Sequence, residues 1–203
     1  YHYYVPEIGP DTPLSAHPES LVQRFAATLA ATGTVTRPVL VGPLSLLLLS
    51  RPETTDDSGV RPLDRLEDVV ALYTTLLSAL ADAGIPWVQL DEPALAADGW
   101  QLPRAELVAA LETVYARLSY PAHRPQILVT VGYGDAGEDA QLALARTDVD
   151  ALAVDLDRGD VPGEAALRAW GERPVVAGVV GGRTVWRTDL ARAVQKLSLI
   201  HIS

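Results

Sequence analysis

The chain has 203 residues, 48% of them hydrophobic, which is enough for one domain with a sizeable core and argues against disorder. Its formal net charge of −10 argues against nucleic acid or an anionic membrane surface as the main partner. The absence of cysteine excludes disulfides, cysteine-ligated zinc and a thiol nucleophile within this chain. No apolar run approaches the ~18 residues of a membrane span and no signal peptide is visible, so we expect a cytoplasmic protein.

Predicted strands and helices alternate along the whole chain. In chain order they are strand Tyr1–Val5, helix Pro18–Thr32, strand Pro38–Val41, helix Leu63–Ala83, strand Trp87–Leu90, helix Pro103–Leu118, strand Ile127–Val131, helix Gly137–Ala145, strand Ala151–Leu156, helix Gly163–Trp170, strand Val175–Val180 and helix Thr188–Leu197. The apolar runs lack strict alternation, which is typical of strands buried on both faces of a parallel sheet. The helices show apolar residues at helical spacing, as Leu21, Phe25 and Leu29 do.

Strict alternation of strands and helices predicts an α/β fold with parallel strands and right-handed crossovers. Six units of roughly 33 residues each are close to the ~31 residues per unit of a (β/α)8 barrel. No G-x-G-x-x-G motif follows the first strand, which disfavours a dinucleotide-binding sheet. We therefore predict an incomplete (β/α)8 TIM barrel with about six of its eight βα units, the first two being absent.

Both ends of the chain have unusual features. There is no methionine, and Tyr1 opens in the middle of a predicted strand, so we expect the natural N-terminus to lie further upstream. Residues 1–197 form the predicted partial barrel, whereas Ser198–Ser203 follows no pattern and is expected to be a non-native or disordered tail. The longest expected loop is Ser50–Pro62, which is rich in polar residues and proline and is expected to be mobile.

Candidate functional residues are those at the ends of strands, where α/β proteins place their chemistry. They are His2, Glu7, Asp91, Glu92, Tyr133, Asp155 and Asp157. Asp91 and Glu92 are adjacent, so on a strand they point in opposite directions and are not an evident acid–base pair. A catalytic carboxylate here needs a partner from another strand, with Asp155 as a candidate. The alternative is a carboxylate that accepts hydrogen bonds from loop N–H groups and braces the rim of the barrel.

Other kinds of site receive little support from the residues. The histidines His2, His17, His123 and His201 are far apart, and none falls in a ligand-spacing motif, so no metal site is predicted. There is neither a G-x-S-x-G nucleophile motif nor a phosphate-binding P-loop. The pattern of residues alone therefore predicts no catalytic residue and no particular reaction.

Four segments together resemble the cobalamin-independent methionine synthase family. They are Tyr1–Glu7 (YHYYVPE), Arg37–Ser45 (RPVLVGPLS), Trp87–Leu95 (WVQLDEPAL) and Gly181–Leu190 (GGRTVWRTDL), in the order and at spacings compatible with the family. The resemblance covers the chain up to about Leu197, and four ordered segments make it specific. It corresponds to the family's N-terminal barrel, from the third strand to the eighth.

The resemblance implies a methyltransferase that needs no cobalamin. Its reaction would move a methyl group from 5-methyltetrahydropteroyltri-L-glutamate to homocysteine, and a zinc ion in the C-terminal barrel would bind the homocysteine sulfur. The zinc ligands of the family include cysteine and lie in that other barrel, so the zinc site is not in this chain. The chain would instead scaffold the C-terminal barrel of the same polypeptide and help to bind folate, and alone it is expected to be inactive and poorly stable.

Asp91 and Glu92 match the family's Asp-Glu-Pro motif, and with His2 they are the candidate substrate-binding residues at the mouth of the barrel. Two other interpretations stay open. One is an enzyme of the uroporphyrinogen decarboxylase-like barrels, acting through Asp91. The other is a non-catalytic barrel that binds folate or a protein partner.

Overall fold

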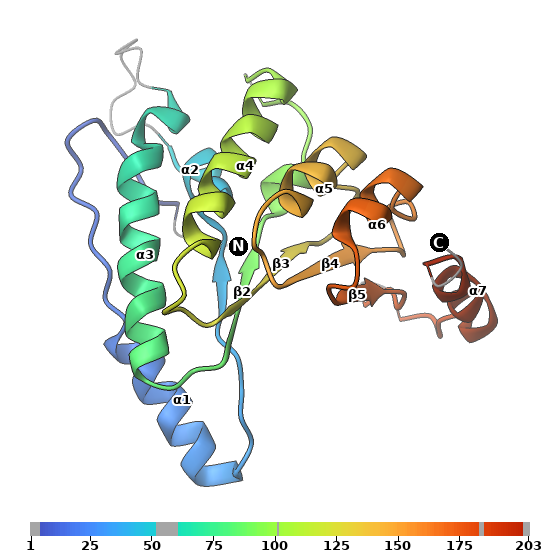
Figure 1. Ribbon diagram of the computed structural model, residues 1–203, viewed down its shortest axis with the longest axis horizontal. Coiled ribbons are helices and arrows are strands. Elements are labelled where there is room, and N and C mark those ends of the chain that lie inside the picture. The colour runs from blue at the N-terminus through green and yellow to red at the C-terminus, as the bar shows by residue number, and fades with distance from the viewer. Residues whose placement is uncertain (1–4, 52–60, 101, 183–184, 201–203) are drawn as a thin grey trace.

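A five-stranded parallel sheet forms the centre of the computed structural model, which describes residues 5–51, 61–100, 102–182 and 185–200 (Figure 1). The strands are β1 (Val39–Val41), β2 (Trp87–Asp91), β3 (Gln126–Val131), β4 (Ala151–Asp155) and β5 (Val175–Gly178). They lie side by side in chain order, and every neighbouring pair is parallel. An ordered parallel sheet with helical crossovers is the architecture of an incomplete (β/α)8 barrel, as the sequence predicts.

The described residues form seven helices, of which the third to the sixth pack in a row along one face of the sheet (Figure 1). They are α1 (Glu19–Thr32), α2 (Pro43–Leu49), α3 (Leu66–Asp82), α4 (Arg104–Ser119), α5 (Glu138–Ala145), α6 (Glu164–Trp170) and α7 (Leu190–Ile200), with short 3-10 turns η1 (Pro62–Arg65) and η2 (Pro93–Ala96). In α3, Val69, Tyr73 and Leu80 are buried on one stripe, and Gly84 follows the helix with a left-handed φ of 73°. That conformation favours glycine and ends the helix where the sequence predicts.

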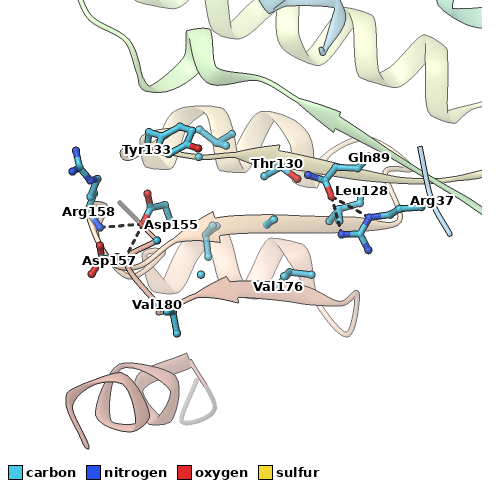
Figure 2. A pocket seen from close by; sticks show the side chains of 17 residues that line it. Arg37, Gln89, Leu128, Thr130, Tyr133, Asp155, Asp157, Arg158, Val176 and Val180 are labelled. Atoms are coloured by element: carbon cyan, nitrogen blue, oxygen red, sulfur yellow. Dashed lines mark hydrogen bonds between the residues drawn. The ribbon is translucent and has the colours of Figure 1, made fainter. Parts of the chain in front are cut away.

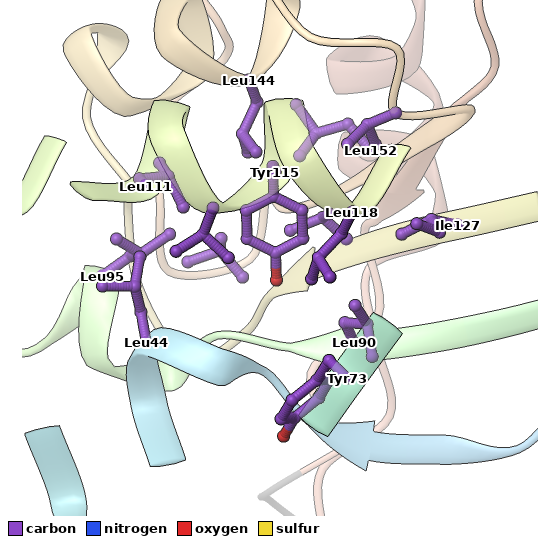
Figure 3. Packing of buried hydrophobic residues seen from close by; sticks show 14 of the residues in the cluster. Leu44, Tyr73, Leu90, Leu95, Leu111, Tyr115, Leu118, Ile127, Leu144 and Leu152 are labelled. Atoms are coloured by element: carbon purple, nitrogen blue, oxygen red, sulfur yellow. The ribbon is translucent and has the colours of Figure 1, made fainter. Parts of the chain in front are cut away.

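The main core lies between these helices and the sheet. From the strands it receives alternate side chains, such as Val88 and Leu90 of β2, both fully buried. From α4 it receives Tyr115, which is also fully buried and lies among leucines of neighbouring elements (Figure 3).

The opposite face of the sheet, here named the inner face, turns away from α3–α6. It carries Val39, Val41, Trp87, Gln89, Asp91, Leu128, Thr130, Ala151, Ala153, Asp155, Val176 and Gly178. Val39, Val41 and Val176 are 54%, 48% and 48% exposed, so this face is only partly covered by the described residues. The prediction of burial on both faces is therefore wrong for β1 and β5. A closed barrel buries its inner face by curling the sheet upon itself, and the five described strands do not close.

Arginine–proline pairs precede three of the five strands: Arg37-Pro38 before β1, Arg124-Pro125 before β3 and Arg173-Pro174 before β5. Proline lacks an N–H, and the start of a strand is a position that tolerates this loss. The proline carbonyls still accept hydrogen bonds from the neighbouring strand: Pro38 O accepts from Gln89 N, and Pro174 O accepts from Leu152 N.

Two of these arginines form hydrogen bonds that connect segments at the amino-terminal end of the sheet. The Arg124 guanidinium contacts the Asp150 carboxylate at 2.6 Å and also donates to the carbonyl of Asp148, in the segment before β4. Arg173 donates to the carbonyls of Trp170, Ala145, Thr147 and Val149 at 2.7–3.1 Å. Each arginine therefore ties its own strand to the connection that precedes β4.

Several boundaries differ from those predicted. Helix α2 was not predicted, because no element was assigned between the strand Pro38–Val41 and the loop Ser50–Pro62. Helix α7 extends to Ile200, so Ser198–Ile200 continues the helix where the sequence predicts a break after Leu197. Most of the predicted strand Tyr1–Val5 and of the loop Ser50–Pro62 lies outside the described residues. Beside them, Glu7 and Arg51 form an isolated parallel bridge. Over the described part of the chain, no helix combines the length and hydrophobicity needed to cross a membrane.

Candidate functional site

The carboxyl ends of the strands meet at one edge of the sheet and bring several polar side chains to the inner face. Asp91 ends β2 and lies opposite Thr130 of β3 in the ladder, while Asp155 ends β4 opposite Gly178 of β5. Thr130 in turn lies opposite Ala153, two residues before Asp155. Alternation therefore places Asp91, Thr130 and Asp155 on the same face, with β3 between the two carboxylates.

A chain of hydrogen bonds runs along β2 on this face. The Arg37 guanidinium donates to Oε1 of Gln89 at 2.7 and 3.0 Å, and Nε2 of Gln89 donates to Oδ1 of Asp91 at 2.8 Å. Because the Arg37 guanidinium can only donate hydrogen bonds, the amide oxygen of Gln89 must face Arg37 and the amide nitrogen must face Asp91. The amide nitrogen then holds one oxygen of Asp91, which restricts the rotamer of that carboxylate.

A cavity of about 320 Å³ lies over the inner face and the ends of β3–β5 (Figure 2). Polar side chains of Arg37, Gln89, Thr130, Tyr133, Asp155, Asp157 and Arg158 line it together with apolar residues. Thr130 Oγ1 is buried and has no hydrogen-bond partner in the described structure. Tyr133 is 70% exposed and has a φ of 67°, a conformation that is uncommon for a residue other than glycine and that clusters at functional sites.

Asp155 organises the loop that follows β4. Its Oδ1 accepts hydrogen bonds from the amides of Asp157 at 2.9 Å and Arg158 at 3.0 Å. Asp157 is exposed next to it, and both residues lie at the rim of the cavity, as predicted for strand-end residues. Asp91 and Asp155 thus share a face, but the structure shows no direct contact between them.

Glu92 points the other way and is fully buried. Its Oε1 and Oε2 accept hydrogen bonds from the amides of Leu44 at 3.2 Å and Ser45 at 2.7 Å, in the first turn of α2. Tyr115 of α4 donates its hydroxyl to Oε1 at 2.8 Å. Helix α2 begins after Gly42, which has no side chain to cap it, so Glu92 satisfies the amides that a local N-cap residue would satisfy.

The prediction that Glu92 lies at the mouth of the barrel is therefore corrected. Alternation along β2 sends Asp91 to the inner face and Glu92 into the packing between α2 and α4. This is the bracing role that the sequence left open for a carboxylate at this position. His2 lies outside the described residues, and Glu7 is exposed beside the bridge to Arg51.

Burial perturbs the acidic groups around Glu92. It raises the pKa of the Glu92 carboxyl, and hydrogen bonds from Ser45, Tyr115 and Leu44 oppose this shift. Burial, followed by the nearby Glu92 carboxylate, also raises the pKa of the Tyr73 and Tyr115 hydroxyls. All three groups belong to one region at the carboxyl ends of β1 and β2.

Gly42 is required by the position of Glu92. A Cβ atom at residue 42 would lie 2.2 Å from Cδ of Glu92, and the carboxylate cannot move away without losing its partners. We expect Gly42→Ala to lower the free energy of unfolding by about 2 kcal/mol, through overpacking. Urea unfolding followed by circular dichroism measures this change. The matched control is Gly132→Ala, where a Cβ meets nothing within 4 Å, and equal losses in both variants would contradict the explanation.

The sequence pointed to the strand ends but missed the residues that organise them. Arg37 and Ser45 lie within the family-like segment Arg37–Ser45 and Gln89 lies within Trp87–Leu95, but the resemblance does not say which residues they contact. Tyr115 lies in none of the four segments. The available signals were the polar residue Gln89 within the apolar strand Trp87–Leu90 and the family-like segments themselves. In the part of the chain that the structure describes, no three histidine, aspartate or glutamate side chains gather as a metal site would require.

Comparisons of the sequence with known proteins all find members of one family. Residues 1–202 match the family described as cobalamin-independent synthase, N-terminal domain. The chain is 46% identical over 201 residues to the 5-methyltetrahydropteroyltriglutamate–homocysteine methyltransferase of Mycolicibacterium paratuberculosis, and 42% identical over 201 residues to that of Mycobacterium leprae. Each alignment covers 98% of this chain and 25% of the relative, so the chain spans a quarter of the length of the curated relatives it matches.

Two solved structures share the fold. The putative vitamin-B12 independent methionine synthase of Listeria monocytogenes superimposes with a TM-score of 0.68 at 17% identity, covering 95% of this chain and 62% of that chain. The B12-independent methionine synthase of Shewanella sp. W3-18-1 gives 0.66 at 16% identity, covering 94% and 57%. Identities this low establish likeness of fold alone.

Proposed function

The chain belongs to the cobalamin-independent methionine synthase family, in the part that corresponds to its N-terminal domain, and we propose that it serves as a scaffold in a methyltransferase of that kind. The reaction would transfer a methyl group from 5-methyltetrahydropteroyltri-L-glutamate to homocysteine in the cytoplasm, and the chain would support the C-terminal barrel and help to hold the folate. The match over residues 1–202 carries this proposal.

Zinc, which the resemblance implies for the whole enzyme, does not fit the residues of this chain. The sequence has no cysteine, and the described residues hold no cluster of three potential ligands. A structural or thiolate-activating zinc site needs three or four such ligands together. We therefore assign the metal, and with it the activation of homocysteine, to the other barrel, and we expect this chain not to bind zinc tightly.

Within the proposed enzyme, Asp91 is retained as a proposed contact to a substrate; it is not among the residues that line the cavity over β3–β5. Its carboxylate reaches the inner face at the carboxyl end of β2, and the Arg37–Gln89 hydrogen bonds orient it. Among the described residues, Oδ1 is the one oxygen of Asp91 that accepts a hydrogen bond, which leaves the other for a ligand. His2 is retained as a second proposed contact on the basis of its sequence position, whereas Glu92 is not, because it is buried.

The proposal is tested by methionine formation from 5-methyltetrahydropteroyltriglutamate and homocysteine in the presence of zinc. We expect no product from the chain alone. We expect activity from a chimaera in which residues 1–197 replace the matching segment of the Mycolicibacterium paratuberculosis methyltransferase, to which they are 46% identical over the aligned region.

The control is the same methyltransferase with that segment deleted, which should be inactive. A chimaera that folds cooperatively but makes no methionine would contradict the scaffold role. Methionine formation by the chain alone would contradict the assignment of the chemistry to the other barrel.

A further inference from the structure

The cavity of about 320 Å³ over the inner face has groups of opposite charge at its two ends (Figure 2). Arg37 reaches one end beside Gln89, whereas Asp155 and Asp157 lie at the other end, where β4 finishes. The lining between the two ends is mostly apolar and includes Leu128, Ala153, Val176 and Val180. A ligand that fits this cavity therefore has to combine two charged groups with an apolar middle.

The two ends are well separated along the sheet. Gln89 lies opposite Leu128, and Leu128 lies opposite Ala151, so Gln89 and Ala151 stand at the same level of the ladder. Asp155 follows four residues after Ala151, which places it about 13 Å further along the sheet at roughly 3.3 Å per residue. Side chains at both ends shorten this span, but a molecule that touches both still needs an extended chain between its polar groups.

The positive end has donors available for a ligand. The Arg37 guanidinium gives two N–H groups to Oε1 of Gln89, at 2.7 and 3.0 Å. Among the described residues it forms no ion pair, and the carboxylate of Asp91 contacts the amide nitrogen of Gln89 instead. The other N–H groups of the guanidinium can bind a carboxylate, which matches them in geometry and charge.

The negative end has an acceptor available. Asp155 uses Oδ1 for the amides of Asp157 and Arg158, and none of the described residues donates to its Oδ2. The Asp157 carboxylate lies beside it, whereas the side chain of Arg158 is exposed at the rim, where solvent screens its charge. Two carboxylates against one exposed guanidinium favour an ammonium group at this end.

Thr130 lies between the two ends, on β3 (Figure 2). Its Oγ1 is buried and has no hydrogen-bond partner in the described structure, although it belongs to a residue that lines the cavity. A buried hydroxyl of this kind is unfavourable unless another group pairs with it, and a bound molecule is one such group.

From this arrangement we propose that the cavity binds a linear amino carboxylate, with its carboxylate on Arg37, its ammonium on Asp155 and its aliphatic chain over the apolar floor. A multiply charged anion is disfavoured by the two aspartates, and a diamine is disfavoured by Arg37. The proposal goes beyond the proposed methyl transfer, which uses no residue of this cavity.

The test is a titration of the nitrogen-15-labelled 203-residue chain with 6-aminohexanoate, followed by NMR at the amides of Gly132, Gly178 and Gly181. Hexanoate and hexylamine are the matched ligands, because each has the same chain and lacks one of the two charged groups. We expect saturable shifts with 6-aminohexanoate and affinities at least about tenfold weaker for the other two, since each loses one charged hydrogen bond.

Two substitutions test the two ends separately. Arg37→Gln and Asp155→Asn should each weaken the binding of 6-aminohexanoate by about tenfold, and the asparagine retains an oxygen for the two amides of its loop. Arg24→Gln is the control, because Arg24 is an exposed arginine of α1 that contacts the carbonyl of Ser20, and its loss should leave the affinity unchanged.

Thr130→Val tests the middle of the cavity. It removes the unpartnered hydroxyl, so we expect weaker binding with no decrease in the urea midpoint. Thr147→Val is the matched control, since the Thr147 hydroxyl donates to the carbonyl of Leu144 and accepts from the amide of Val149, and its loss should lower that midpoint.

The proposal would be overturned by the absence of saturable shifts up to about 10 mM, by equal binding of the three ligands, or by unchanged affinity in Arg37→Gln. The same titration is made on the chimaera described above. A chimaera that forms methionine but does not bind 6-aminohexanoate would show that another part of the polypeptide covers the inner face, which overturns this site and leaves the proposed function intact.

Discussion

Glu92→Ala is expected to lower the free energy of unfolding by about 4 kcal/mol, the largest loss among the substitutions considered. The change leaves the amides of Leu44 and Ser45 and the hydroxyl of Tyr115 buried without this acceptor. Each buried donor left unpaired costs about 1–3 kcal/mol, and the missing side chain adds a cavity. Urea unfolding at constant pH, read by circular dichroism and by tryptophan fluorescence, gives the value.

Glu67→Ala is the matched control for this substitution. Glu67 is also a glutamate near the start of an element, but its side chain is 73% exposed and its ion pair with Arg117 is on the surface. Exposed pairs contribute about 0–1 kcal/mol, so the control should be close to the wild-type chain. If Glu92→Ala lost no more stability than Glu67→Ala, the bracing role of Glu92 would be wrong.

Arg173→Ala is expected to cost about 3 kcal/mol. The guanidinium donates to four backbone carbonyls and lies 4.0 Å from the centre of the Trp170 ring. Removing it leaves the carbonyls at the end of α5 and before β4 without these donors and removes a cation–π contact. The loss should be visible in urea unfolding, and the total tryptophan fluorescence should change because Trp170 loses this contact.

Arg168→Ala is the control. Arg168 pairs with Glu164 on the exposed surface of α6, and this pair should contribute under about 0.5 kcal/mol to stability. Arg173→Lys adds a second comparison, since a lysine retains the charge but cannot reproduce the planar array of donors. Full stability of the lysine variant would show that charge, and not the array of carbonyl contacts, is what matters at this position.

The sequence predicted the regular elements well where the pattern was local. β2 and β3 were predicted to within one residue at each end, because their apolar runs are bounded by proline and by polar residues. Helix α2 was missed because Val39–Leu49 is a short, mostly apolar stretch interrupted by Gly42-Pro43, and no helical period is visible in it. Its cap comes from Glu92, 48 residues away from Leu44, and no local pattern records such a partner.

In the candidate site, too, the features that depend on local pattern were predicted and the contacts between distant residues were not. Alternation along a strand predicted that Asp91 and Glu92 point in opposite directions, and the burial pattern of β2 confirms this. The hydrogen bonds from Arg37 to Gln89 could not be predicted, because they depend on the register between β1 and β2 and on the turn that precedes β1. Local periodicity thus gives the face of a side chain, whereas its partners follow from the assembled sheet.

The arginine–proline pairs have a consequence for how the protein unfolds. Every strand pairs with its neighbours in the chain, and Arg124 and Arg173 join connections that are also neighbours. Couplings of this kind resemble those of a repeat protein, in which each unit is stabilised mainly by the next. Among the strands of the described residues, β2, β3 and β4 have a neighbour on both sides, whereas β1 and β5 have one. Unfolding should therefore proceed by fraying from the two edges towards a resistant centre, and cooperativity should increase with each further unit added to the array.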